Sequence, residues 1–206
     1  VVVGRRDRHP AAPLTWVDRM TYLEGERDPR MALRAVTFAD ALTCNLSLPM
    51  ALWRDLGGFD ERLRAYEDVE LAYRAVCAGA GLAYSPAAIA YHNHPGSIKA
   101  RLRQTRTYEY YAALILARYP ELQEEIPHLI DKGPLRWRQD SARVLLKKLG
   151  RQVFAWKPVL GAMENLLLLL ADRTSLKGLI RFLYWKVMGS YQLIGLREGR
   201  QSLQHG

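Results

Sequence analysis

The sequence predicts an α/β fold, with an incomplete open sheet and its helices in the first half and amphipathic helices in the second. Short apolar runs of strand length alternate with helical patterns through the first 96 residues. Beyond Ser97 the apolar residues recur at helical spacing only. With 206 residues, 49% hydrophobic and 25% charged, the chain has room for one domain with a core and an appendage. We expect a partial α/β domain at 1–100, a helical extension at 101–149 and a basic amphipathic helical hairpin at 150–206.

The elements of the first half follow from strand-like runs and glycine stop signals. The predicted strands are residues 1–4, 41–48, 82–84 and 89–92, and the predicted helices are residues 49–56 and 67–78. Residues 5–13 are polar and contain proline, which predicts a loop. Pro49 suits a first helical turn, and Gly57 is a natural left-handed cap because glycine has no Cβ to clash there.

The second half carries four helical patterns. The predicted helices are residues 97–119, 139–149, 153–171 and 176–194. One face of the last predicted helix carries Leu176, Leu179, Ile180, Leu183, Val187 and Met188. Charged residues interrupt both of the last two patterns before they reach the roughly 18 apolar residues of a membrane span. A stripe of this kind either packs on a neighbouring helix or lies on a membrane surface.

Charge is unevenly distributed along the chain, whose net charge is +9. Residues 1–98 hold 11 Lys/Arg and 12 Asp/Glu, whereas residues 99–206 hold 19 and 9. A basic half of this kind can bind nucleic acid or anionic lipid, or it can serve solubility alone. No recognition-helix or aromatic-and-basic signature occurs, so we expect no nucleic-acid partner. The two cysteines, Cys44 and Cys77, have no metal-site spacing and are expected to be buried thiols.

Two adjacent carboxylates, Glu67 and Asp68, open the predicted helix 67–78. Backbone N–H groups and the helix dipole favour an ionised carboxylate at that position. An ionised carboxylate within hydrogen-bond reach of a sugar hydroxyl can accept its proton as the oxygen attacks an anomeric carbon. Alone, such a pair is more often a helix cap, and an H-x-H at a strand end, as at His92 and His94, is more often a surface feature than a ligand pair.

The order and spacing of several short motifs favour the catalytic interpretation of these carboxylates over a helix cap. The motifs are G-G-F-D-E at 57–61, E-D-V-E-L at 67–71 with Arg74, Y-S-P-A at 84–87, and His92. This ordered set resembles the family 2 glycosyltransferases, and Asn45 in T-C-N-L-S resembles the asparagine strand that precedes the G-G-F-D-E turn in that family. The resemblance implies the C-terminal half of a GT-A, Rossmann-like domain and transfer of a sugar with inversion.

The resemblance also implies roles for individual residues. Asp68 would be the general base that deprotonates the acceptor hydroxyl, with Glu67 beside it shaping the acceptor site. The substrate-binding positions would be Asn45, Gly57, Gly58 and Arg74, and Arg74 would also pair with Glu70 at i, i+4. The metal-binding position would be His92, with His94 as the second choice, for Mg²⁺ or Mn²⁺.

The donor half of that family pattern is missing from this sequence. No D-x-D occurs in it, and one imidazole is a poor site for a hard cation that prefers several oxygen ligands. We therefore expect the partners to be a nucleotide-diphosphate sugar whose site is incomplete here and a glycan or lipid-linked acceptor. We expect the isolated chain to be inactive, and to lie in the cytoplasm with residues 150–206 attached to an anionic membrane surface. The alternative is a non-catalytic fragment or split partner that binds a glycan or a membrane.

Overall fold

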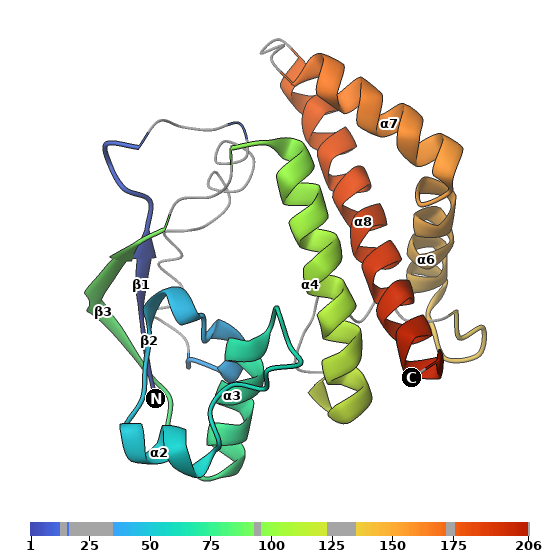
Figure 1. Cartoon of the computed structure of the whole chain (residues 1–206). Coiled ribbons are helices and arrows are strands. Elements are labelled where there is room, and N and C mark those ends of the chain that lie inside the picture. The colour runs from blue at the N-terminus through green and yellow to red at the C-terminus, as the bar shows by residue number, and fades with distance from the viewer. Residues whose placement is uncertain (13–15, 17–34, 93–95, 123–134, 172–175, 206) are drawn as a thin grey trace. The chain divides into compact units, whose positions relative to one another are not determined.

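The protein is described here from a computed structural model, which covers residues 1–12, 16, 35–92, 96–122, 135–171 and 176–205. It divides into two compact units, Val1–Gly96 and Ser97–Gly206. Unit 1 holds a small mixed sheet with helices, and unit 2 is built of helices (Figure 1). The predicted α/β class is confirmed, whereas the three-part division at residues 100 and 149 stays a prediction.

The sheet of unit 1 has three strands in the order β2-β1-β3. The strands are β1 (Val2–Asp7), β2 (Leu46–Ser47) and β3 (Ala83–Tyr91). The central strand β1 pairs antiparallel with β2 and parallel with β3. Since the register shifts after Gly4, whose partner is Ser85 while the partner of Arg5 is Ile89, β3 bulges over residues 86–88. The carboxyl ends of β1 and β3 therefore meet at one edge of the sheet.

Three predictions about these strands were wrong in extent. β1 continues to Asp7, into the segment predicted as a loop, because the parallel ladder with β3 supplies partners for its backbone. In place of the predicted strand 41–48, the chain forms a 3₁₀ turn at Thr43–Asn45, followed by the two residues of β2. The two brief strands predicted at 82–84 and 89–92 are the two paired parts of the single strand β3.

Two helices of unit 1 begin and end as their sequences predict. Helix α2 (Met50–Asp55) follows Pro49 at its N-cap, and Gly57 and Gly58 leave it at φ 75° and 72°, in the left-handed region that favours glycine. Helix α3 (Glu67–Cys77) buries Val69, Leu71, Ala72 and Ala75. Gly79, at φ 85°, stops it. The two predicted boundaries of α3 are confirmed to within one residue.

Unit 2 is a bundle of four helices among the described residues. The helices are α4 (Ile98–Arg118), α6 (Ala142–Phe154), α7 (Lys157–Leu170) and α8 (Lys177–His205). Ser97 and Ser141 cap α4 and α6, since each hydroxyl accepts a backbone N–H from the third residue beyond it. Helix α8 is the centre of the bundle and packs on α4, α6 and α7 (Figure 1).

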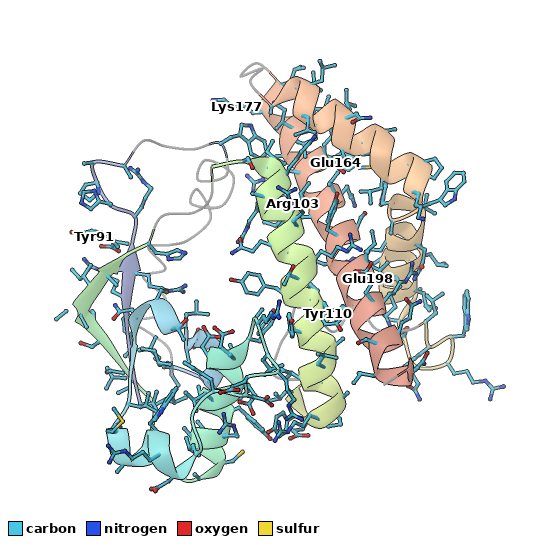
Figure 2. The ribbon with its side chains drawn as sticks, in the orientation of Figure 1. Tyr91, Arg103, Tyr110, Glu164, Lys177 and Glu198 are labelled. Atoms are coloured by element: carbon cyan, nitrogen blue, oxygen red, sulfur yellow. The ribbon has the colours of Figure 1, made fainter. Side chains whose placement is uncertain are left out.

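Helix α8 approaches α4 closely through two glycines. A Cβ at Gly195 would lie 2.2 Å from the Arg106 backbone oxygen, and one at Gly199 would lie 2.3 Å from the Tyr110 backbone oxygen. Neither distance is compatible with a side chain, so the absence of a Cβ sets the spacing of the two helices. Tyr110 lies on α4 in Figure 2.

The apolar face predicted on α8 is used inside unit 2. Its central residues Ile180, Leu183, Val187 and Met188 are buried. Packing on neighbouring helices therefore accounts for these four, and they cannot also meet a lipid surface. Leu176 and Leu179 remain exposed at the beginning of the helix.

Two further observations concern the whole described chain. Cys44 and Cys77 are exposed, so the prediction of buried thiols was wrong. Among the described residues, no single helix has the length and apolar character to cross a membrane. Helices α6 and α7, which meet at an angle of 79°, pass the same composition test only when taken together as a bent pair.

Candidate active site

The first turn of α3 holds the two candidate catalytic carboxylates. Asp68 is 7% exposed. One of its oxygens, Oδ2, accepts a hydrogen bond from the Thr43 backbone N–H at 2.9 Å, and the other, Oδ1, accepts from the Val69 backbone N–H at 2.9 Å. The Asp68 carboxylate is therefore held between the beginning of its own helix and the 3₁₀ turn at Thr43–Asn45.

Glu67 has a different environment from its neighbour. It is half-buried at the start of α3. Burial raises the pKa of the Glu67 carboxyl above its ordinary value of 4.5, and repulsion from Asp68 adds to this, while a hydrogen bond to its own backbone amide opposes it. The two adjacent carboxyl groups thus differ, since Asp68 is fixed by backbone donors and Glu67 is more open to solvent.

A buried ion pair joins α3 to the G-G-F-D-E turn. Glu70 is 1% exposed, and the Arg74 guanidinium donates to both of its carboxylate oxygens, at 2.8 and 2.7 Å. The same guanidinium donates to the backbone oxygens of Leu56 at 2.5 Å and Gly58 at 2.7 Å. The predicted i, i+4 pair is confirmed, and Arg74 fixes the turn that follows α2.

Asn45 joins the two parallel strands at the bulge. Its side-chain nitrogen donates to the backbone oxygen of Arg5 in β1 and to that of Ala88 in β3, both at 2.8 Å. Gly4 makes room for this side chain, because a Cβ there would lie 2.2 Å from the Asn45 side-chain nitrogen. The contacts of Asn45 within the chain are therefore structural, and its predicted contact with substrate stays a prediction.

His92 follows β3 directly at the carboxyl edge of the sheet. Its backbone N–H donates to the Asp7 backbone oxygen at 2.8 Å, so it lies beside the end of β1. Asp7 in turn forms an ion pair with Arg5 at 3.0 Å. His94 lies outside the described residues. No group of three or more His, Cys, Asp or Glu residues in the described ranges could hold a metal ion, so the described residues do not by themselves fit the expected divalent cation.

One short segment links two of the predicted site residues, Asp68 and Asn45. The 3₁₀ turn Thr43–Asn45 contacts Asp68 through Thr43 and the bulge of β3 through Asn45. His92 lies beyond that bulge, at the end of the same strand. That the His92 ring and the Asp68 carboxylate share one site stays a prediction.

Three residues near this site were missed at the level of sequence. Thr43 anchors Asp68, and Asp7 lies next to His92 across the parallel strand pair. Tyr66, at the N-cap of α3, has φ 61° and ψ 10°, a left-handed conformation that is uncommon for a bulky residue. Tyr66 lies directly before Glu67, so this uncommon conformation stands where the first turn of α3 begins. Only the acidic character of Asp7 was visible in the sequence, which predicted a loop at this position.

Known proteins resemble part of this chain. The chain is 37% identical over 82 residues, 40% of its length, to the pre-mycofactocin glycosyltransferase of Mycobacterium tuberculosis, in both strain CDC 1551 / Oshkosh and strain ATCC 25618 / H37Rv. The match spans only 17% of the length of these relatives. No protein-family model matches the chain, and no solved structure matches it significantly. The partial match supports a relationship to glycosyltransferases.

Proposed function

We propose that this chain contributes the acceptor side of a glycosyltransferase that moves a sugar from a nucleotide-diphosphate donor to a glycan or lipid-linked acceptor with inversion. The observation that carries the proposal is the carboxylate pair at the start of α3, where Asp68 is fixed by two backbone donors. The partial similarity to a pre-mycofactocin glycosyltransferase supports the reaction class. The family 2 assignment rests on the ordered motifs at residues 57–92.

In the proposed reaction Asp68 is the general base. The acceptor hydroxyl oxygen forms a bond to the anomeric carbon of the donor, the bond from that carbon to the diphosphate oxygen breaks, and the hydroxyl proton passes to the Asp68 carboxylate. Attack from the face opposite the leaving diphosphate inverts the anomeric centre. The two backbone amides that hold Asp68 supply the fixed orientation that a base needs.

Glu67 is proposed to contact the acceptor. It is the more exposed of the two carboxyl groups, and its raised pKa places it closer to the working range of an acid or base. The experiment below therefore tests both residues, and its result decides which carboxyl group is the general base and which contacts the acceptor.

Binding of the nucleotide-diphosphate sugar and of a divalent cation is also part of the proposal. His92 would supply one imidazole to Mg²⁺ or Mn²⁺, and the further oxygen ligands that such a cation prefers would come from outside the described residues. No D-x-D occurs in the sequence, so we expect the 206-residue chain alone to bind donor weakly and to transfer no sugar. A cytoplasmic location is part of the same proposal.

The test measures sugar transfer in the longest natural protein that contains this chain, using nucleotide-diphosphate sugars as donors. Asp68→Asn should lower turnover at least about a hundredfold, since general-base catalysis contributes roughly 10²–10⁴-fold, with donor binding unchanged. Glu67→Gln should mainly raise the acceptor KM. Asp55→Asn, an exposed carboxylate at the end of α2, is the matched control and should leave both constants unchanged.

Two outcomes would overturn parts of this proposal. Near-normal turnover in Asp68→Asn, with loss in Glu67→Gln, would exchange the two roles. Normal turnover in both variants would remove this carboxylate pair from catalysis. The non-catalytic alternative, in which the chain binds a glycan without turnover, would then be favoured if glycan binding persisted.

A further inference from the structure

An apolar stripe lies on the outer face of α6. Leu146, Leu149 and Val153 follow one another at i, i+3 and i+7 and therefore share one side of the helix. Leu146 is 73% exposed and Val153 58% exposed. Trp156, 64% exposed, continues this line at the bend between α6 and α7. We call these four residues the α6 stripe.

The bundle does not cover this stripe. Helix α6 contacts α8 and α7, and only Lys148 is buried along it, through its ion pair with Asp140 at 2.7 Å. Figure 1 shows α6 and α4 on different sides of α8, which leaves the outer side of α6 without a helix against it in the described part of unit 2. Contiguous exposed apolar residues of this kind mark an interaction surface.

The charged residues of α6 and of the first half of α7 are all positive. Residues 141–163 contain five Lys/Arg and no Asp or Glu. Arg143, Lys147 and Arg151, at i+4 spacing, form the row of α6 next to the stripe, and Arg143 and Lys147 are exposed. An apolar stripe bordered by cations suits a surface with an apolar interior and an anionic rim.

The corner at Trp156 adds a second basic feature. An open hollow of about 900 Å³ begins there. Its lining includes the apolar Leu160 and Ile194, the basic Lys157 and Arg197, and Glu198, whose charge is paired with Arg106. A phosphate-bearing headgroup matches this combination, because cations and an apolar wall lie side by side. Tryptophan is favoured at the boundary between water and acyl chains, where its ring is apolar and its N–H stays wet.

We propose that the α6 stripe binds the surface of an anionic phospholipid bilayer, with α6 lying in the headgroup plane and Trp156 inserted at the boundary. The inference does not depend on glycosyl transfer. It also differs from attachment through α8, whose central apolar face is buried in the bundle. The composition of α6 and α7 as a bent pair agrees with contact to lipid.

The first test is sedimentation of the full chain with phosphatidylcholine vesicles, with and without an equimolar share of phosphatidylglycerol. We expect binding to the anionic vesicles that weakens as salt is raised, since mobile ions screen the basic row. The double variant Leu146→Glu/Val153→Glu should weaken binding at least about tenfold because it places charge in the apolar contact. Leu203→Glu, at an exposed leucine near the end of α8, is the matched control and should bind normally.

A second variant keeps the test valid if the double variant does not fold. Lys147→Glu changes an exposed side chain, so circular dichroism should stay unchanged while affinity for anionic vesicles falls about tenfold or more. Trp156→Phe should reduce the blue shift of tryptophan emission that the vesicles cause.

Several results would overturn the proposal. The chain could remain in the supernatant with anionic vesicles at low salt, or Leu203→Glu could weaken binding as much as the double variant does. Resistance to extraction by alkaline carbonate would show an inserted α6–α7 pair in place of surface binding. Self-association that depends on Leu146, without vesicle binding, would assign the stripe to a protein interface.

Discussion

The contact between Gly4 and Asn45 predicts a strong energetic coupling between two residues that are 41 positions apart. Gly4→Ala would place a Cβ 2.2 Å from the Asn45 side-chain nitrogen, so Asn45 must leave its position. Both of its hydrogen bonds, to Arg5 and Ala88, are then lost. Gly4 is not among the glycines with positive φ, so backbone strain adds nothing to the effect.

The magnitude follows from those two hydrogen bonds. Each contributes about 0.5–1.5 kcal/mol net, so Gly4→Ala should lower the free energy of unfolding by about 1–3 kcal/mol. Restricting the unfolded chain offsets part of this, by about 0.4–1 kcal/mol. Asn45→Ala alone should have a similar cost. In the Asn45→Ala background Gly4→Ala should then cost almost nothing, which gives a coupling energy of about 1–3 kcal/mol.

The assay combines urea unfolding with hydrogen exchange of the backbone amides of β1 and β3, which reports on unit 1 alone. Gly81→Ala is the matched control, because nothing lies within 4 Å of a Cβ built there. It should leave the exchange of both strands unchanged or slow it. Additive effects of Gly4→Ala and Asn45→Ala would refute the reasoning, as would normal exchange in Gly4→Ala.

Three further predictions concern packing and charge. In α8, Gly195→Ala should destabilise by about 1–3 kcal/mol through contact with the α4 backbone, whereas Gly189→Ala, which meets nothing, should stabilise by about 0.5–1 kcal/mol; thermal unfolding compares them. Arg74→Met should cost about 3 kcal/mol in urea unfolding because it removes the guanidinium that pairs with the buried Glu70 carboxylate, and adding Glu70→Gln should restore part of the loss. The raised pKa of Glu67 in the folded state means that this one carboxyl group should lower the free energy of unfolding as the pH rises above 4.5. Glu67→Gln should therefore be the more stable protein at neutral pH and equal to wild type at acid pH, and an unchanged difference across this range would contradict the pKa assignment.

The sequence did not predict which cysteines and which apolar side chains are exposed. Cys77 lies at the end of α3 and was expected to be buried, yet it is exposed. On α8 the apolar face faces the bundle, while on α6 a comparable face is exposed. An amphipathic pattern predicts that one face of a helix is apolar, but it does not show whether that face packs on another helix or which helix that is.

The sequence by itself determined the features that depend on neighbouring residues. It predicted the bounds of α3, the left-handed turn at Gly57 and the pairing of Glu70 with Arg74, because stop signals, φ angles and i, i+4 contacts are local. It also placed Glu67 and Asp68 in the first turn of that helix. Their roles in catalysis stay predictions.

Only the tertiary structure decided the features that need partners distant in the chain. The single strand β3 and the extension of β1 to Asp7 exist because each supplies the other with a hydrogen-bonded ladder. Asn45 became a bridge between strands, and Thr43 an anchor for Asp68, through contacts across more than 20 residues. Such contacts are set by the folded path of the chain, which no short pattern of residues contains.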